Sequence, residues 1–252
     1  MKNRKASILL LLAWAVTALT LSSCESDMAS PVTDVAQGQG GSMARFAISG
    51  DHLYTVDHSS LNLFDISDPA NPRQRQEVPL SFGIETIFPF QDKLFIGTQT
   101  GMHIYSIQTP AAPKHLSHYE HVVSCDPVVT DGRYAYITLR TGTACRQAIN
   151  QLQIVDLQNI LDPVRVQQYD MTNPKGLGID RSTLFVCDDG LKVYDASDVM
   201  AIQLKQHFPI NAYDVIPDNG RLLVIGSDGF YQYQYHEEEL ELLSTILVEP
   251  SI

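Results

Sequence analysis

Short apolar stretches alternate with polar turns along the chain, and one five-residue pattern returns: apolar, variable, apolar, apolar or aromatic, then Asp. Full copies are LNLFD at 61–65, LQIVD at 152–156 and LKVYD at 191–195, with weaker copies MHIYS at 102–106 and FYQYQ at 230–234. The copies follow one another at intervals of about forty residues, which is typical of stacked supersecondary units. The pattern therefore predicts a repeat protein rather than one irregular domain.

Each repeat divides into short strands joined by hairpin turns. In the fourth unit the expected strands are 176–180, 183–187, 191–196 and 202–208, and the breaks carry Asp, Ser and Gly. The second and third strands are apolar on both faces, so both faces must be covered. The fourth strands, such as RQRQ at 73–76, are polar and often follow a proline, as solvent-facing edge strands do.

These features predict an all-β fold, a β-propeller of about five four-stranded antiparallel blades near 43–80, 81–121, 122–171, 172–210 and 211–247. An open stack of the same units and a two-layer sandwich are the alternatives. The chain enters on an inner strand and leaves on an outer one. We therefore expect the ring to close by packing of the last blade on the first, or through a strand recruited from 28–40.

Four stretches resemble the LVIVD-repeat family, a group of propeller-like secreted or lipid-anchored bacterial proteins. They are the copies LQIVD and LKVYD, the run DPANP at 68–72 and the run DGRYAY at 131–136. The resemblance covers 43–247 and weakens in units two and five, where Ser106 and Gln234 replace the Asp. It implies a propeller but no particular reaction. We expect the repeat Asp to cap the turn after the third strand through an Asx-type bond.

The first residues have the features of a signal peptide, because Lys2, Arg4 and Lys5 precede an apolar run too short to span a bilayer. The run ends in Leu-Ser-Ser-Cys24, which resembles the bacterial lipobox and implies that Cys24 is the lipidated first residue of the mature chain. An ordinary secretory signal is the alternative. The predicted organisation is thus a signal peptide at 1–23, a flexible lipidated tether at 24–42 and a propeller domain at 43–252.

The sequence of the tether indicates where the protein is located, and the net charge limits which partners it can bind. Glu25 directly follows Cys24 and Ser26 comes next, so the Asp-based inner-membrane retention signal is absent, and the expected location is the cell envelope at the outer membrane, with the lipid as anchor. The formal net charge of −12 repels nucleic acid, which leaves envelope proteins or glycans as expected partners.

Cys125 and Cys145 belong to the third unit, at the start of its first strand and beyond the end of its second. In an antiparallel meander these positions share an edge, so an oxidising compartment favours a disulfide between them. Cys187, within LFVC, is expected to be a buried free thiol. The chain has no C-x-x-C pair, so no cysteine metal site and no cofactor is expected.

One end of the propeller carries the candidate site. The third unit has an extended loop at 141–151 that contains Arg146 and follows Arg140. Counting back ten positions from the second-strand aromatic residue, or its equivalent, reaches residues expected to ring the channel mouth: Ala44, Glu85, Asp126, Lys175 and Asp214.

Two functions fit this ring, and no nucleophile motif distinguishes them. The leading interpretation is a noncatalytic propeller that binds a protein or polar ligand at its channel face. The alternative is a hydrolase or lyase acting on a glycan or lactone, with Glu85, Asp126 and Asp214 as acid, base or metal ligands. In the simplest interpretation these side chains only bond backbone groups and water.

Two weaker signals concern histidines and glycines. His115, His118 and His121 are spaced by three, but side chains alternate along a strand, so we expect exposed rim histidines rather than zinc ligands. Gly176 and Gly178 are expected to allow close approach of neighbouring blades rather than to form a dinucleotide loop.

Overall fold

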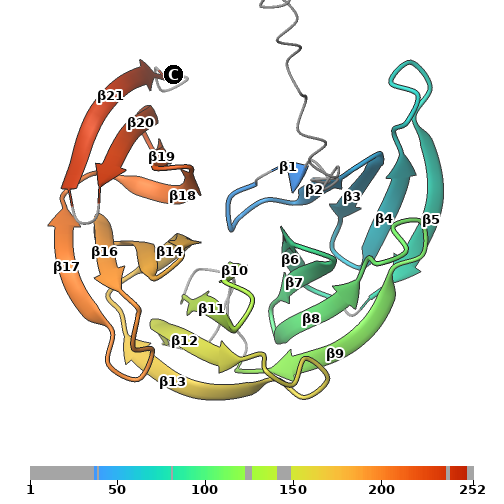
Figure 1. Ribbon diagram of the computed structural model, residues 1–252, viewed down its shortest axis with the longest axis horizontal. Helices are drawn as coiled ribbons and strands as arrows, with labels where there is room; N and C mark the ends of the chain where they lie inside the picture. The colour runs from blue at the N-terminus through green and yellow to red at the C-terminus, as the bar shows by residue number, and fades with distance from the viewer. Residues whose placement is uncertain are drawn as a thin grey trace, which may run out of the picture. The chain divides into compact units, whose positions relative to one another are not determined.

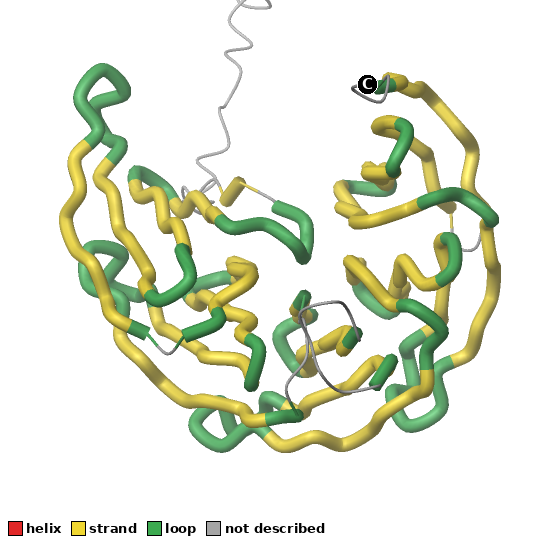
Figure 2. Tube along the Cα trace, turned by 180° about the vertical axis from the view of Figure 1, so that it is seen from behind, coloured by secondary structure: helices red, strands yellow, loops and turns green. Residues whose placement is uncertain are grey.

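The computed structural model describes residues 37–38, 40–80, 82–122, 127–140, 149–236 and 239–248. They belong to one compact unit that spans Val35–Ile252. Every regular element in these ranges is a β-strand (Figure 2). None of the ranges contains a helix long and apolar enough to cross a membrane.

The strands form five antiparallel sheets, here called blades one to five in chain order. Blade one contains β1 (Gln37–Gly38), β2 (Phe46–Ser49), β3 (His52–Val56), β4 (Ser60–Asp65) and β5 (Arg73–Pro79). Blade two contains β6 (Ile84–Phe90), β7 (Lys93–Thr98), β8 (Gly101–Ser106) and β9 (Lys114–Glu120). Blade three contains β10 (Val128–Thr130), β11 (Tyr134–Leu139), β12 (Gln151–Asp156) and β13 (Val164–Asp170). Blade four contains β14 (Pro174–Asp180), β15 (Thr183–Asp188), β16 (Leu191–Asp195) and β17 (Gln203–Phe208), and blade five contains β18 (Ala212–Asp218), β19 (Arg221–Gly226), β20 (Gly229–His236) and β21 (Glu239–Leu247).

The blades follow one another along an arc, with β5, β9, β13, β17 and β21 on its outside (Figure 1). Each blade is a simple meander whose strand order equals the chain order. The prediction of an all-β propeller of about five four-stranded blades is confirmed, and blade one carries the short β1 as a fifth strand.

Neighbouring blades bury each other's faces. Leu94 and Ile96 of β7 are fully buried in an apolar cluster shared with blade one. Phe95 lies between them in the chain and is buried in a cluster shared with blade three. Successive side chains of a strand point to opposite faces, so β7 is covered on both sides, as its apolar pattern predicts.

The repeat Asp caps the turn after the third strand in blades one, three and four, as predicted. Asp65 accepts a hydrogen bond from the backbone N–H of Ser67 at 3.0 Å, and Asp195 accepts one from Ser197 at 2.9 Å. Asp156 accepts the corresponding bond from Gln158 at 2.7 Å. In the weak second copy the hydroxyl of Ser106 accepts from Gln108 at 3.3 Å, so the turn survives the substitution.

The two glycines of β14 allow the close packing of blades four and five, as predicted. A β-carbon at Gly176 would lie 2.7 Å from the carbonyl oxygen of Tyr213. A β-carbon at Gly178 would lie 2.6 Å from Cδ of Pro217. Any larger residue at either position would push β18 away from β14.

In the part of the chain that the structure describes, the last blade does not pack on the first in the way that the sequence led us to expect. Apolar clusters join the four pairs of successive blades, but within the described residues no such cluster joins blade five to blade one. Phe46 of blade one is 57% exposed, and Ile246 of blade five is 63% exposed. β1 does come from the recruited range 28–40, but it pairs with β2 and so extends blade one.

A polar clamp joins the segment before β2 to blades four and five. The hydroxyl of Ser42 donates a hydrogen bond to Asp214 at 2.8 Å and accepts one from the backbone N–H of Leu177 at 2.8 Å. The backbone N–H of Met43 also donates to Asp214, at 3.2 Å. Gly41 and Ser42 are buried, so the end of the predicted tether is part of the folded body.

Replacing Ser42 with Ala should lower the free energy of unfolding by about 1–3 kcal/mol, because it leaves the buried N–H of Leu177 without its partner and removes one of the two hydrogen bonds to the Asp214 oxygen, which keeps the bond from the N–H of Val215. The matched control is Ser67→Ala, which removes an exposed hydroxyl that also donates to an Asp. Its expected effect is about 0.5 kcal/mol or less. Urea unfolding followed by circular dichroism measures both, and equal losses in the two variants would contradict the clamp.

Candidate functional site

A cavity of about 320 Å³ opens where residues of blades one to four converge. We call it the channel cavity. Its polar and charged lining includes Arg45, His58, Glu85, Gln99, Arg140 and Lys175. Three of the predicted site residues, Glu85, Arg140 and Lys175, are thus brought to one cavity.

Glu85 owes its position to a β-bulge at the start of β6. The register with β7 runs from Ile84↔Thr98 to Thr86↔Gly97, so Glu85 is the extra, unpaired residue. A bulge bends the strand and re-aims its side chain. The Glu85 carboxylate accepts a hydrogen bond from the side-chain amide of Gln99 at 3.1 Å, which orients it in the cavity.

Cations outnumber the carboxylate in the channel cavity. Arg45 donates to the carbonyl oxygen of Ile84 at 3.1 Å, and the Lys175 ammonium lies 4.2 Å from the centre of the Tyr213 ring. With Arg140, these residues give the lining three cations to the single carboxylate of Glu85. The expected mouth of three carboxylates and one ammonium is therefore not what the described part of the lining shows. Asp126 and Arg146 lie outside the described residues.

Asp214, the third predicted carboxylate, belongs to the clamp and not to the cavity lining. Its side chain is buried, with the residue 6% exposed, and burial raises its pKa, while hydrogen bonds from Ser42 and Met43 act in the opposite direction. The bulge of β18 explains the difference: the register passes from Ala212↔Gly226 to Asp214↔Ile225 and leaves Tyr213 as the extra residue. Counting back ten positions from the second strand did not allow for this bulge and reached Asp214. Tyr213, which lies beside Lys175, is the residue at the position that the count was meant to find.

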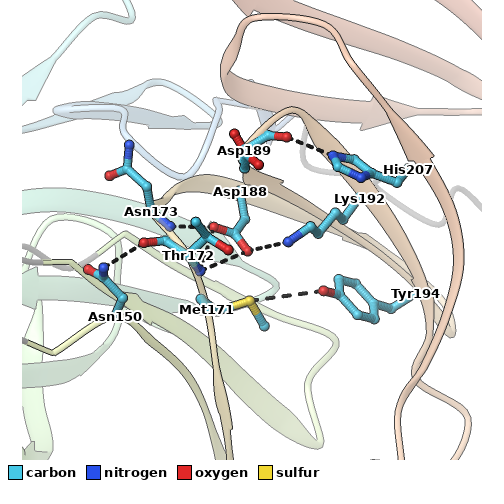
Figure 3. Close-up of polar contacts among 9 residues, drawn as sticks. All are labelled: Asn150, Met171, Thr172, Asn173, Asp188, Asp189, Lys192, Tyr194 and His207. Atoms are coloured by element: carbon cyan, nitrogen blue, oxygen red, sulfur yellow. Dashed lines mark hydrogen bonds and ion pairs between the residues drawn. The ribbon is translucent and has the colours of Figure 1, made fainter.

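A second buried carboxylate, Asp188, holds the segment that delivers Lys175 to the cavity (Figure 3). Asp188 is fully buried and accepts the backbone N–H of Thr172 at 2.9 Å and that of Asn173. The Lys192 ammonium pairs with it at 2.7 Å. The sequence signal was an Asp that ends a buried strand and precedes a Lys by four residues, but Asp188-Asp189-Gly190 also fits an ordinary hairpin turn.

The cysteine predictions divide between described and undescribed residues. Cys187 is a buried free thiol, as expected, and burial raises its pKa. It is therefore protonated and unreactive at neutral pH. Cys24, Cys125 and Cys145 lie outside the described residues, so lipidation and the 125–145 disulfide stay predictions.

Comparisons with known proteins identify one repeat and the fold. A family model described as LVIVD repeat matches residues 40–78, which confirms the resemblance drawn from the motifs. No curated protein sequence matches the chain.

Three solved structures illustrate the fold similarity. The periplasmic gluconolactonase of Pseudomonas aeruginosa is 13% identical, with 79% of this chain and 68% of that chain covered and a TM-score of 0.58. A Bacteroides fragilis protein provisionally assigned as a 6-phosphogluconolactonase is 10% identical, with 81% and 70% covered and a TM-score of 0.61. A functionally unknown protein of Desulfotomaculum acetoxidans is 11% identical, with 86% and 72% covered and a TM-score of 0.63.

At these identities the similarity shows the fold alone. The leading prediction of a noncatalytic binding propeller is nevertheless contradicted, because two of these structures of the same fold are described as lactonases. The comparison favours the alternative, a hydrolase or lyase that acts on a glycan or lactone. The sequence pointed the other way because it shows no catalytic motif, and a carboxylate aimed by a bulge leaves no motif to find.

Replacing Asp188 with Ala should cost about 3–5 kcal/mol of unfolding free energy, because Lys192 and two backbone N–H groups lose their buried partner. Asp198→Ala is the matched control, since Asp198 caps an exposed turn by accepting from Met200. Denaturant unfolding of the two variants checks the difference. A loss at Asp188 no larger than that at Asp198 would show that the buried pair does not support this segment.

Proposed function

Because this chain is an LVIVD-repeat propeller with a fold shared by lactonases, we propose that it is a hydrolase that opens a small anionic lactone in the channel cavity. One observation carries the proposal: the Glu85 carboxylate, oriented by Gln99, shares a cavity with three cations. A volume of about 320 Å³ suits a ligand of the size of one sugar ring.

Glu85 is the proposed general base. It takes a proton from a water molecule, whose oxygen adds to the lactone carbonyl carbon. The ring carbon–oxygen bond then breaks, and the leaving alkoxide takes back the proton held by Glu85, which gives a hydroxy acid and regenerates the carboxylate. Lysine and arginine side chains stabilise the oxyanion that forms on the carbonyl oxygen during addition. Arg45, Arg140 and Lys175 are the cations available for this role.

The excess of positive charge in the cavity supports an anionic substrate. Arginine guanidinium groups bind carboxylate and phosphate through paired hydrogen bonds. The protein as a whole carries a net negative charge, so the three cations of the cavity lining stand out as a place that attracts an anion. We therefore propose a lactone that bears a carboxylate or phosphate group.

The signal and lipobox resemblance support a proposed location for this reaction. Lipidation of Cys24 would tether the propeller to the cell envelope at the outer membrane. A disulfide between Cys125 and Cys145 would form there, since thiols oxidise outside the cytoplasm. The substrate would accordingly be a lactone that reaches the envelope.

Glu85→Gln should lower kcat/KM for lactone hydrolysis by roughly 100-fold or more, because the amide cannot accept the proton of water. Glu77→Gln is the matched control, since Glu77 is exposed on the outer strand β5, and its activity should equal that of the wild type. The measurement is acid release from neutral, carboxylated and phosphorylated sugar lactones, corrected for spontaneous hydrolysis. Absence of turnover by the wild type on all three classes, or equal rates for Glu85→Gln and wild type, would contradict the proposal.

A further inference from the structure

Three histidines gather on the outer half of blade two, outside the lining of the channel cavity. His103 comes from β8, and His115 and His118 come from β9. We call them the rim histidine triad. His103 and His118 are partly exposed and His115 is exposed, so ions in solution can reach the group.

A β-bulge brings the triad onto one face of the sheet. Along a regular strand, residues three apart point to opposite faces, which is why we expected His115 and His118 to diverge. In the structure His103 pairs with His118 and Tyr105 pairs with His115, and the register shift between these pairs leaves Leu116 as the extra residue. The bulge therefore reverses the alternation, and both β9 histidines join His103 on the same face.

Two imidazole nitrogens of the triad already stand at the spacing of metal ligands. Nδ1 of His103 and Nε2 of His115 are 3.3 Å apart. Two nitrogens that bind one tetrahedral Zn²⁺ at about 2.0–2.1 Å each are separated by about 3.3–3.4 Å. The ring of His118 stacks on that of His103, with 4.2 Å between centroids.

The third imidazole has an unused nitrogen. Nε2 of His118 is buried, and no hydrogen-bond partner for it is found among the described residues. Its ring packs where Gly101 leaves room, since a β-carbon at Gly101 would lie 2.7 Å from this atom. A buried nitrogen without a partner loses its hydration and gains nothing in return, so rotation of this ring toward a bound ion would be favourable.

Burial disfavours the charged imidazolium form of His103 and His118, and the neutral form of imidazole is the one that binds metals. Burial, together with the charges that His118 and His115 would carry, lowers the pKa of His103 to about 4. Burial also lowers the pKa of His118, and the nearby Glu120 carboxylate opposes that change only in part. Imidazole nitrogen is a ligand for Zn²⁺, Cu²⁺ and Ni²⁺ rather than for Ca²⁺ or Mg²⁺.

We propose that the rim histidine triad binds one divalent transition-metal ion, represented by Zn²⁺. His103 and His115 supply the first two ligands, and His118 supplies the third after its ring rotates. Among the described residues no three side chains already surround a common ion position, so binding requires the His118 ring to rotate, and water would take the fourth position. An ion here would link β8 to β9 and stabilise blade two by mass action.

The test is a Zn²⁺ titration by isothermal calorimetry, on the full chain purified in detergent and treated with a chelator. We expect one Zn²⁺ per chain, and at least a tenfold weaker affinity when His103 and His115 are both replaced with Ala. The control variant carries His52→Ala and His236→Ala, which removes two histidines outside the triad, and it should bind as the wild type does. No saturable binding, or equal affinity in the wild type and the His103/His115 variant, would overturn the proposal.

A second measurement needs no substitution. Diethyl pyrocarbonate modifies accessible histidines of the wild type, and peptide mapping by mass spectrometry reports each one. Zn²⁺ should protect His103 and His115 while His52 and His236 stay reactive. Protection confined to histidines outside the triad would overturn the proposal even if the double variant fails to fold.

Discussion

The structure depends on each blade covering the apolar face of the next. Leu94, Phe95 and Ile96 show the constraint in three consecutive residues, because all three are buried and they pack alternately against blades one and three. A blade taken alone would expose both of these faces, and burying a side chain of this size contributes about 1.5–3 kcal/mol. Stability therefore comes from interfaces between repeats, and the inner strands that carry Glu85 and Lys175 are fixed by the same interfaces.

Among the described residues, apolar packing covers only one face of the first blade and one face of the last, and polar contacts supplement the packing there. The segment that contains Ser42 reaches Asp214 of blade five and Leu177 of blade four. The same segment places Met43 and Arg45 in the lining of the channel cavity. The clamp and the proposed site are thus built from one stretch of chain, so a change that loosens the clamp should also displace Arg45.

The sequence predicted the parts of this structure that follow from period and polarity. Blade number, strand positions, the Asp caps, the glycine contact of β14 and the buried Cys187 all rest on local patterns that packing leaves intact. The bulges could not be predicted in this way. One extra residue at Glu85, Tyr213 or Leu116 changes which side chains share a face, and nothing in the local polarity reports it. The third cation of the cavity was missed for a related reason, since Arg45 comes from a turn between strands and only the fold brings it to Glu85.

Hydrogen–deuterium exchange resolved by strand tests the central claim most directly, because it reports how firmly each repeat is held. Blades two, three and four are flanked on both faces, whereas blades one and five are each flanked on one. The account predicts that amides of β7, β11 and β15 exchange most slowly and that those of β3 and β19 exchange measurably faster. Equal protection of all five strands, or slowest exchange in β3 or β19, would contradict the claim that covering by neighbours holds the fold together.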